Sequence, residues 1–188
     1  MKKITLVTGN WAKLVNTQNK LKPYGIDVDN IKMETIEIQA DTAEEVAAYS
    51  AKYAADLLQK DILKIDSGSY VESLKGFPGP YTHYCEDTIG NEGLLKMMEG
   101  ETNRKAEFRE ALAYCKPGEE PIVFSSITRG TIALEESGTH GWSWDFVFIP
   151  DGKDVTLGHF EDDERFSLWD DSAYKELGEY LEKTLTNK

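Results

Sequence analysis

The sequence ITLVTGNWAKLV at residues 4–15 decides the expected fold. Ile4–Val7 is a short apolar run with β-branched residues, which predicts a buried strand. Thr8-Gly9-Asn10 has the composition of a turn, and apolar residues then recur at helix-like intervals from Trp11 to Leu21. A strand, a glycine turn and a helix in direct succession are typical of α/β proteins.

Later segments continue the alternation of strands and helices. Asp41–Glu44 has the form of a capping box, and it opens an Ala-rich helix that is expected to reach Leu58. Ile62–Ile65 predicts a buried strand that runs into Asp66. The apolar spacing in Asp171–Thr184 predicts a surface helix.

The middle of the chain predicts an antiparallel addition to this α/β pattern. Expected helices are Gly93–Met98 and Arg104–Glu110, and expected strands are Ile122–Ile127, Gly130–Leu134 and Phe146–Ile149, the first two joined as a hairpin at Arg129-Gly130. No stretch rich in Gly, Ser or Pro divides the chain. We therefore predict a single domain over residues 1–188 with an α/β fold.

Composition limits the possible partners. The 188 residues include 21 Lys and Arg against 34 Asp and Glu, a formal net charge of −13. Binding to a nucleic-acid polymer depends on cationic side chains that neutralise phosphates, so the charge argues against such a partner. A small nucleotide is compatible with it, because the nucleotide brings Mg²⁺ that an acidic site can hold.

Cysteine content and hydropathy indicate a reduced compartment. Cys85 and Cys115 lie far apart, without the spacing of a zinc site or a disulfide framework. The N-terminal apolar run is too short for a signal peptide, and no apolar stretch approaches the ~20 residues of a membrane span. We expect a cytoplasmic protein that has no membrane partner.

The turn Thr8-Gly9-Asn10 is the first candidate for chemistry. A glycine turn before a helix exposes backbone N–H groups at the positive end of the helix dipole, and Lys13 adds a full charge one turn later. This arrangement suits a polyphosphate. The alternative is an ordinary turn followed by a solvated lysine.

Two carboxylates near strand ends are the second candidate. Glu37 and Asp66 are expected where α/β proteins collect ligand-binding groups. If they lie together, they are suited to hold Mg²⁺ and to polarise a water for attack on phosphorus. The alternative for each carboxylate is a capping role.

The segment Trp142–Phe146 is the third candidate. Trp142 and Trp144 could stack on a nucleobase while Asp145 accepts hydrogen bonds from it. The alternative is that both indoles belong to the core.

Taken together, these residues resemble the inosine triphosphate pyrophosphatase family, also called the Ham1-like family, and its archaeal-type members most closely. The matching motifs are Thr8-Gly9-Asn10 with Lys13, Glu37-Ile38-Gln39, the helix with Lys52, Asp66-Ser67-Gly68, Gly76–Tyr81, Ile89–Leu94 and Trp144-Asp145. They occur in the family's order over nearly the whole chain. The resemblance implies two lobes of a mixed, twisted β-sheet flanked by helices, similar to an anticodon-binding α/β fold, with a central cleft.

The resemblance also implies an activity and roles for residues. The family hydrolyses nucleoside triphosphates to monophosphates and pyrophosphate with Mg²⁺, usually as a homodimer. Asn10, Lys13 and Lys52 would hold the triphosphate, beside Thr8 and Ser67 of the matched motifs. Glu37 would be a metal ligand, and Asp66 would bind metal or activate the water.

Departures from the family's pattern concern acids and the base-reading motif. Ile65 and Asn16 stand where the family has acids, and His83 stands at a basic position. At the C-terminal end, Arg165 falls at the family's lysine and Trp169-Asp170-Asp171 falls at its Ser-His-Arg.

The C-terminal departure leads to a hypothesis about base preference. Residues 161–171 contain six acids and one Arg, where the family carries basic residues. An ionised Asp only accepts hydrogen bonds, so Asp170 or Asp171 in the pocket would favour a base that presents an amino group. In the alternative both carboxylates face water. A nucleotide-binding protein without hydrolysis is the second function that the departures leave open.

Overall fold

The computed structural model describes residues 2–184 and divides them into two compact units. Unit 1 comprises the described residues up to Asp66, Glu110–Ser126, and those from Asp171 onward. Unit 2 comprises Ser67–Arg109 and Ile127–Asp170. Three long strands, β3, β5 and β6, contribute residues to both units.

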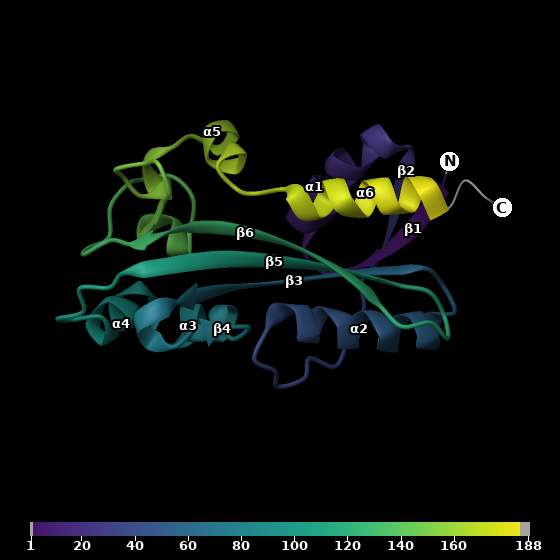
Figure 1. The fold of residues 1–188 in the computed structure, drawn as a ribbon, viewed down its shortest axis with the longest axis horizontal. Coiled ribbons are helices and arrows are strands. Elements are labelled where there is room, and N and C mark those ends of the chain that lie inside the picture. Colours follow the sequence, from purple (N-terminus) through teal and green to yellow (C-terminus); the bar gives the residue numbers. More distant parts are fainter. Residues whose placement is uncertain (1, 185–188) are drawn as a thin grey trace. The chain divides into compact units, whose positions relative to one another are not determined.

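Strands and helices alternate mainly in the first third of the chain (Figure 1). The strands are β1 (Lys2–Val7), β2 (Ile26–Ile31), β3 (Ile62–Val71), β4 (Pro78–Gly79), β5 (Lys105–Cys115), β6 (Ile122–Ile132) and β7 (Phe148–Pro150). The α-helices are α1 (Trp11–Leu21), α2 (Ala43–Leu58), α3 (Thr82–Thr88), α4 (Gly90–Met97), α5 (Asp162–Ser167) and α6 (Ser172–Thr184). The expected α/β class is confirmed, with a seven-stranded sheet in the order β2-β1-β3-β5-β6-β7 and β4 paired with β3.

Unit 1 is a three-layer arrangement. Strand β1 pairs in parallel with β2, Ile4 opposite Val28, and with β3, Leu6 opposite Leu63. Helices α1 and α6 lie on one face over a core that includes Leu63 and Leu177, and the alanines of α2 cover the opposite face (Figure 1). Parallel strands that are covered on both faces have continuous apolar sequences. Strand β1 has such a sequence, so it was predictable.

Unit 2 contains the antiparallel pairings. Strand β7 pairs with β6, Thr131 opposite Ile149, and β4 pairs with β3. Gly68 of β3 has no room for a side chain, because a Cβ there would lie 2.3 Å from the carbonyl oxygen of Gly79. The core of this unit gathers side chains of α4, β7 and the loops, Leu94, Phe148 and Leu157 among them.

The predicted helix at Arg104–Glu110 is wrong, because this segment opens strand β5. β5 lies between β3 and β6, and its second half is buried on both faces. Leu112 packs in the core under α1 and α6, whereas Ala113 packs in the core under α2. Tertiary pairing therefore outweighs the local helix-like pattern of charges.

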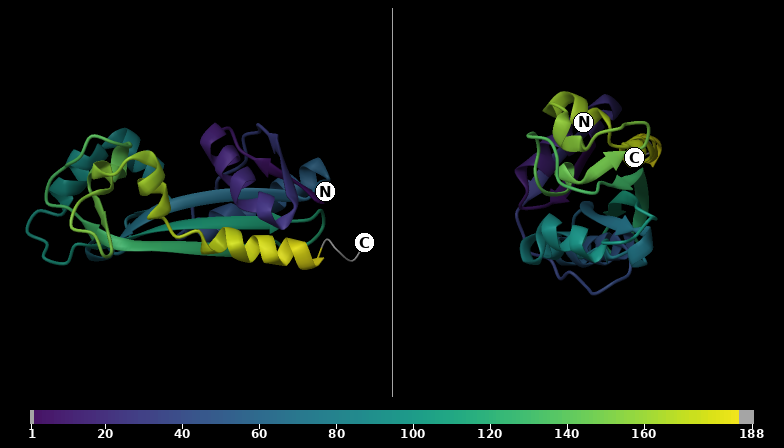
Figure 2. Two further views of the ribbon diagram at one scale, coloured as in Figure 1. Left: turned by 90° about the horizontal axis from the view of Figure 1, so that it is seen from above. Right: turned by 90° about the vertical axis from the view of Figure 1, so that its left-hand side faces the viewer.

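The predicted hairpin at Arg129-Gly130 is also wrong. Strand β6 runs without interruption through this dipeptide, as the long ribbons in Figures 1 and 2 show. A Cβ at Gly130 would lie 2.2 Å from the carbonyl oxygen of Ile149. The glycine therefore permits the close approach of β7 and does not mark a turn.

Three further boundaries differ from the expectation. Strand β3 continues past Ile65 to Val71, so Asp66 lies within the strand and not at its end. The capping box of α2 lies one residue later: the Thr42 hydroxyl accepts from the Glu45 N–H at 3.2 Å, and the Glu45 carboxylate accepts from the Thr42 N–H at 3.1 Å. Strand β7 begins at Phe148, since Ser143–Phe146 forms a 3₁₀ turn. Within residues 2–184, no helix is long and apolar enough to span a membrane.

Candidate active site

A pocket of about 460 Å³ opens within unit 1 at the end of strand β1, beside the middle of β3. We call it the strand-end pocket. Its lining comes from three segments, Val7–Asn10 with Lys13, Met33–Thr35 with Glu37, and Lys64–Asp66. Most of the polar residues expected to bind phosphate or metal are thus placed around one cavity, as the parallel pairing of β1 and β3 requires.

Thr8 and Asn10 stabilise the turn at the N-terminus of α1. The side-chain oxygen of Asn10 accepts from the N–H groups of Ala12 at 2.9 Å and Lys13 at 3.2 Å, so Asn10 is the N-cap of the helix. The N–H of Asn10 in turn donates to the Thr8 hydroxyl at 3.0 Å. These bonds fix the turn and occupy two of the helix's free N–H groups, which leaves lysine as the main source of positive charge for a ligand.

Two lysines reach the strand-end pocket. The Nζ of Lys13 lies 3.5 Å from the carbonyl oxygen of Ile65, and the Nζ of Lys64 donates to the Thr35 hydroxyl at 2.9 Å. Burial lowers the pKa of Lys64; Glu37 and Asp66 oppose this shift, and the nearby positive charge of Lys13 adds to it. A half-buried lysine beside a second cation is typical of a site for an anion.

Glu37 and Asp66 are the carboxylates that suit a metal ion in this pocket. Among residues 2–184, no group of three or more metal-ligating side chains occurs, so an all-protein cage is not supported. Mg²⁺ is commonly held by one or two carboxylates together with phosphate oxygens and water. The donor set of the pocket fits that mode of binding.

Ile65, which stands at an acid position of the family, points away from these carboxylates into the core under α1 and α6. A different acid, Glu110 of β5, lies on this side of the sheet. The Tyr174 hydroxyl lies 3.5 Å from its carboxylate and accepts from the Asn16 amide at 3.3 Å. Burial raises the pKa of Glu110, and the charge of Lys13 opposes the shift.

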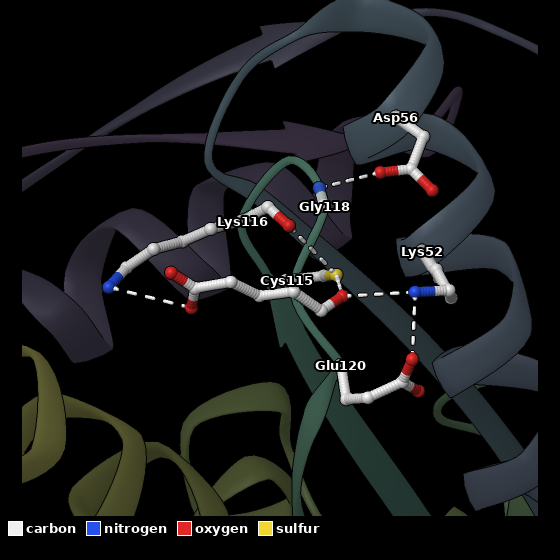
Figure 3. Close-up of polar contacts among 7 residues, drawn as sticks. Lys52, Asp56, Cys115, Lys116, Gly118 and Glu120 are labelled. Atoms are coloured by element: carbon white, nitrogen blue, oxygen red, sulfur yellow. Dashed lines mark hydrogen bonds and ion pairs between the residues drawn. The ribbon is translucent and has the colours of Figure 1, made fainter.

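Lys52 lies outside the lining of the strand-end pocket. Its ammonium forms an ion pair with Glu120 at 2.9 Å and donates to the carbonyl oxygen of Glu119 at 3.2 Å (Figure 3). The same loop is tied to α2 by Asp56, which accepts from the Gly118 N–H at 2.8 Å (Figure 3). In this structure Lys52 therefore connects α2 to the loop between β5 and β6 through these two contacts.

The residues expected to contact the base belong to unit 2. Trp142 is 62% exposed, whereas Trp144 is buried in the core, so only the first indole is accessible. Asp145 is buried and accepts from the Trp142 N–H at 3.1 Å. Burial raises the pKa of Asp145; that backbone hydrogen bond and the guanidinium of Arg165 oppose the shift.

Arg165 is the centre of a group that we call the Arg165 cluster: the buried Arg165 and Asp145 with the exposed Asp162 and Trp142. The guanidinium lies 3.5 Å from the Asp145 carboxylate and donates to Asp162 at 2.8 Å. It also lies over the Trp142 ring, 5.3 Å from its centroid. Its side chain is 2% exposed, and its buried Nη1 has no hydrogen-bond partner among the described residues.

The acids after Trp169 have partners within their own units. The Asp170 carboxylate accepts from the Ile127 N–H at 3.1 Å, and Asp171 forms an ion pair with Lys20. Ser67 follows Asp66 on β3 and is half-buried, and His83 lies on the exposed face of α3 beside Glu86 and Asp87. The structure thus groups Asp170 and Asp171 with backbone and lysine partners.

Sequence reasoning missed Lys64, Glu34 and Thr35 in the pocket lining. The signal for Lys64 was present, because residues two apart on a strand share a face and Asp66 was already a candidate. Glu34 and Thr35 lie in an irregular segment after β2, a strand that was itself not predicted.

Fold and pocket together define an α/β protein with a polar strand-end site suited to phosphates. The sequence model of the Ham1 family matches residues 4–169. The chain is 45% identical over 166 residues to the dITP/XTP pyrophosphatase of Methanopyrus kandleri, covering 88% of each, and 38% identical to that of Thermococcus kodakarensis, covering 97% of this chain and 99% of the other. The Ham1 protein of Staphylococcus aureus superposes with a TM-score of 0.84 at 26% identity, covering 97% and 99%. The chain belongs to the Ham1 family.

Proposed function

We propose that the protein is a nucleoside triphosphate pyrophosphohydrolase that cleaves (d)NTP to (d)NMP and pyrophosphate. The observation that carries the proposal is the strand-end pocket, which combines Lys13 and Lys64 with Glu37 and Asp66. Relatives that the chain matches over most of their length are named dITP/XTP pyrophosphatases, which supports the same reaction class.

The residues of the pocket have different roles in this reaction. The lysines neutralise the phosphate chain, so that an attacking water meets less negative charge. Glu37 and Asp66 would hold Mg²⁺, which when bound polarises the phosphoryl oxygens. Asp66 can also accept the proton that the attacking water loses. The bond between the α-phosphorus and the bridging oxygen breaks, and pyrophosphate leaves with that oxygen.

Base preference is a separate part of the proposal. The sequence hypothesis is that Asp170 or Asp171 favours a base with an amino group. The contacts of these carboxylates with the Ile127 N–H and with Lys20 support the alternative, in which neither reads the base. The relatives' names then indicate inosine- and xanthine-type substrates for this chain as well.

The remaining expectations concern the state of the protein. We propose a single functional domain and, from the resemblance, a homodimer in the cytoplasm. Sedimentation at several concentrations measures the mass in solution, and a monomer at micromolar concentration would contradict the dimer.

The experiment that tests the function is a pyrophosphate-release screen with Mg²⁺ across ribo- and deoxyribonucleoside triphosphates, including the inosine and xanthine forms. We expect release with at least one of them. The second candidate, a nucleotide-binding protein without hydrolysis, is motivated by Ile65 and Asn16 at acid positions of the family. Nucleotide binding without any pyrophosphate release would favour it.

A further inference from the structure

The face of β3 that lines the strand-end pocket carries a cation next to a carboxylate. Leu63 and Ile65 point into the apolar core under α1 and α6. Lys64 and Asp66 therefore share the opposite face of the strand, and both line the pocket. Residues two apart on a strand are separated by about 7 Å, so these two charged side chains are direct neighbours on that face.

Lys64 lies close to both carboxylates that suit a metal ion. Its Nζ donates to the Thr35 hydroxyl at 2.9 Å, which holds the ammonium in the pocket. Thr35 precedes Glu37 by two residues, and both line the pocket. The negative charges of Glu37 and Asp66 both act on the ammonium of Lys64. A cation that these two carboxylates hold is therefore near the positive charge of Lys64.

The charges around the pocket nearly balance one another without a bound ion. Lys13 and Lys64 contribute two positive charges to the lining, and Glu34, Glu37 and Asp66 contribute three negative charges. The lining therefore has a formal net charge of only −1. The affinity of a protein site for a divalent cation depends on the number of charged oxygen ligands. A lining in which lysines offset most of the carboxylates attracts a free metal ion only weakly.

We propose that Lys64 weakens the binding of a free divalent cation at Glu37 and Asp66, because it places a like charge beside them. The inference rests on the proposed function, since it concerns the metal ion that the same site would use. The phosphate oxygens of a nucleotide add negative charge to the pocket and are themselves ligands of Mg²⁺. With Lys64 present, the pocket holds a divalent cation firmly only together with a phosphate ligand.

The test is a titration of the full chain with Mn²⁺ at low ionic strength and without nucleotide, in which the electron paramagnetic resonance signal of free Mn²⁺ measures the affinity. Mn²⁺ serves as the probe because it prefers the same oxygen ligands as Mg²⁺. Wild type is compared with Lys64→Met, Lys64→Arg and Lys60→Met. Lys60 is exposed, precedes β3 and lies outside the pocket lining, so Lys60→Met is the matched control for the change in net charge.

We expect Lys64→Met to bind Mn²⁺ about tenfold more tightly than wild type. A divalent ion and an ammonium at about 7 Å, the spacing of neighbours on one face of a strand, repel each other by an amount of that order even in water. Lys64→Arg keeps the cation and Lys60→Met keeps the pocket, so both should bind Mn²⁺ like wild type. An unchanged affinity in Lys64→Met, or an equal gain in Lys64→Arg or Lys60→Met, would each overturn the inference.

A double variant locates the bound ion. Lys64→Met combined with Asp66→Asn should lose the gain in affinity, because one of the two carboxylates is neutral; a gain that persists would place the ion elsewhere and overturn the inference. The thermal unfolding midpoint shows whether Lys64→Met is folded, and Lys64→Gln, which is also neutral, provides the same comparison if it is not.

The titration contains no nucleotide, so its result does not depend on hydrolysis. If Lys64→Met gains affinity for Mn²⁺ but wild type releases pyrophosphate from no nucleoside triphosphate, the proposed function fails while the inference about Lys64 stands. If wild type releases pyrophosphate and Lys64→Met shows no gain, the inference fails while the proposed function stands.

Discussion

The strand-end pocket and the Arg165 cluster both gather charged side chains, but they use them in different ways. In the pocket, Lys13 and Lys64 form no ion pair with a carboxylate within residues 2–184. In the Arg165 cluster, the guanidinium is within ion-pair distance of both Asp145 and Asp162. The first arrangement is suited to a ligand, whereas the second mainly holds its own loop together.

The comparison shows how the distribution of charge relates to the candidate site in this chain. Residues 161–171 have the greater excess of acid, but Asp162 is paired with Arg165, Asp170 with a backbone N–H and Asp171 with Lys20. Local charge density therefore does not identify the site. The placement of charged groups of both signs around a cavity is the better guide.

The largest effect is expected from Asp66→Asn, which removes a charge from the strand-end pocket and keeps the shape of the side chain. Pyrophosphate release should fall by about a hundredfold or more, because the group that binds metal or accepts the proton is lost. The measurement is kcat/KM with Mg²⁺. Asp163→Asn, at an exposed position of α5, is the matched control and should retain wild-type activity. Near-normal activity of Asp66→Asn would remove Asp66 from the mechanism.

Arg165→Met tests whether the Arg165 cluster is structural. Asp145 would be left buried without its cation, and breaking a buried ion pair typically costs about 3–5 kcal/mol. Urea unfolding measures the loss, and Arg129→Met, whose side chain is 65% exposed, is the control with little expected effect. A loss below about 1 kcal/mol, the range of exposed ion pairs, would contradict a structural role.

A smaller effect separates the two hypotheses about base preference. If Asp170 and Asp171 stay with their partners, inosine and xanthine triphosphates should be hydrolysed faster than ATP or GTP, and Asp171→Asn should leave this ratio unchanged. If a carboxylate binds the base instead, ATP or GTP should be hydrolysed faster than the inosine and xanthine triphosphates. One mismatched buried donor–acceptor pair costs about 1–3 kcal/mol, which changes the ratio by roughly tenfold or more. The ratio of kcat/KM values decides between them.

The smallest effect concerns Glu110. Because burial raises its pKa, its charged form destabilises the folded state above that pKa, and this cost is absent below the unfolded value near about 4.3. Glu110→Gln should therefore raise the free energy of unfolding at pH 7–8 and bring no gain at pH 4. Denaturant unfolding at both pH values measures this. The exposed Glu101→Gln is the control, and an equal gain at both pH values would contradict the assignment.

Elements with a local signature were predictable, and elements defined by their neighbours were not. Strand β1, helix α1 and helix α6 follow from apolar periodicity and capping residues in their own segments. Strand β5 was misread as a helix because its first half has helix-like charges, whereas its conformation is imposed by pairing between β3 and β6. Gly130 was misread as a turn because a close backbone approach and a turn require the same residue.

The candidate site divides in the same way. The sequence by itself predicted the turn before α1 and selected Lys13, Glu37 and Asp66, although it expected Asp66 at the end of a strand and the structure places it within β3. Only the tertiary structure shows that Lys64 lines the same pocket as Lys13, because the alternation of side chains on β3 places it there. It also shows that Lys52 pairs with Glu120 in the loop between β5 and β6. Both placements depend on long-range packing, which no local pattern of residues encodes.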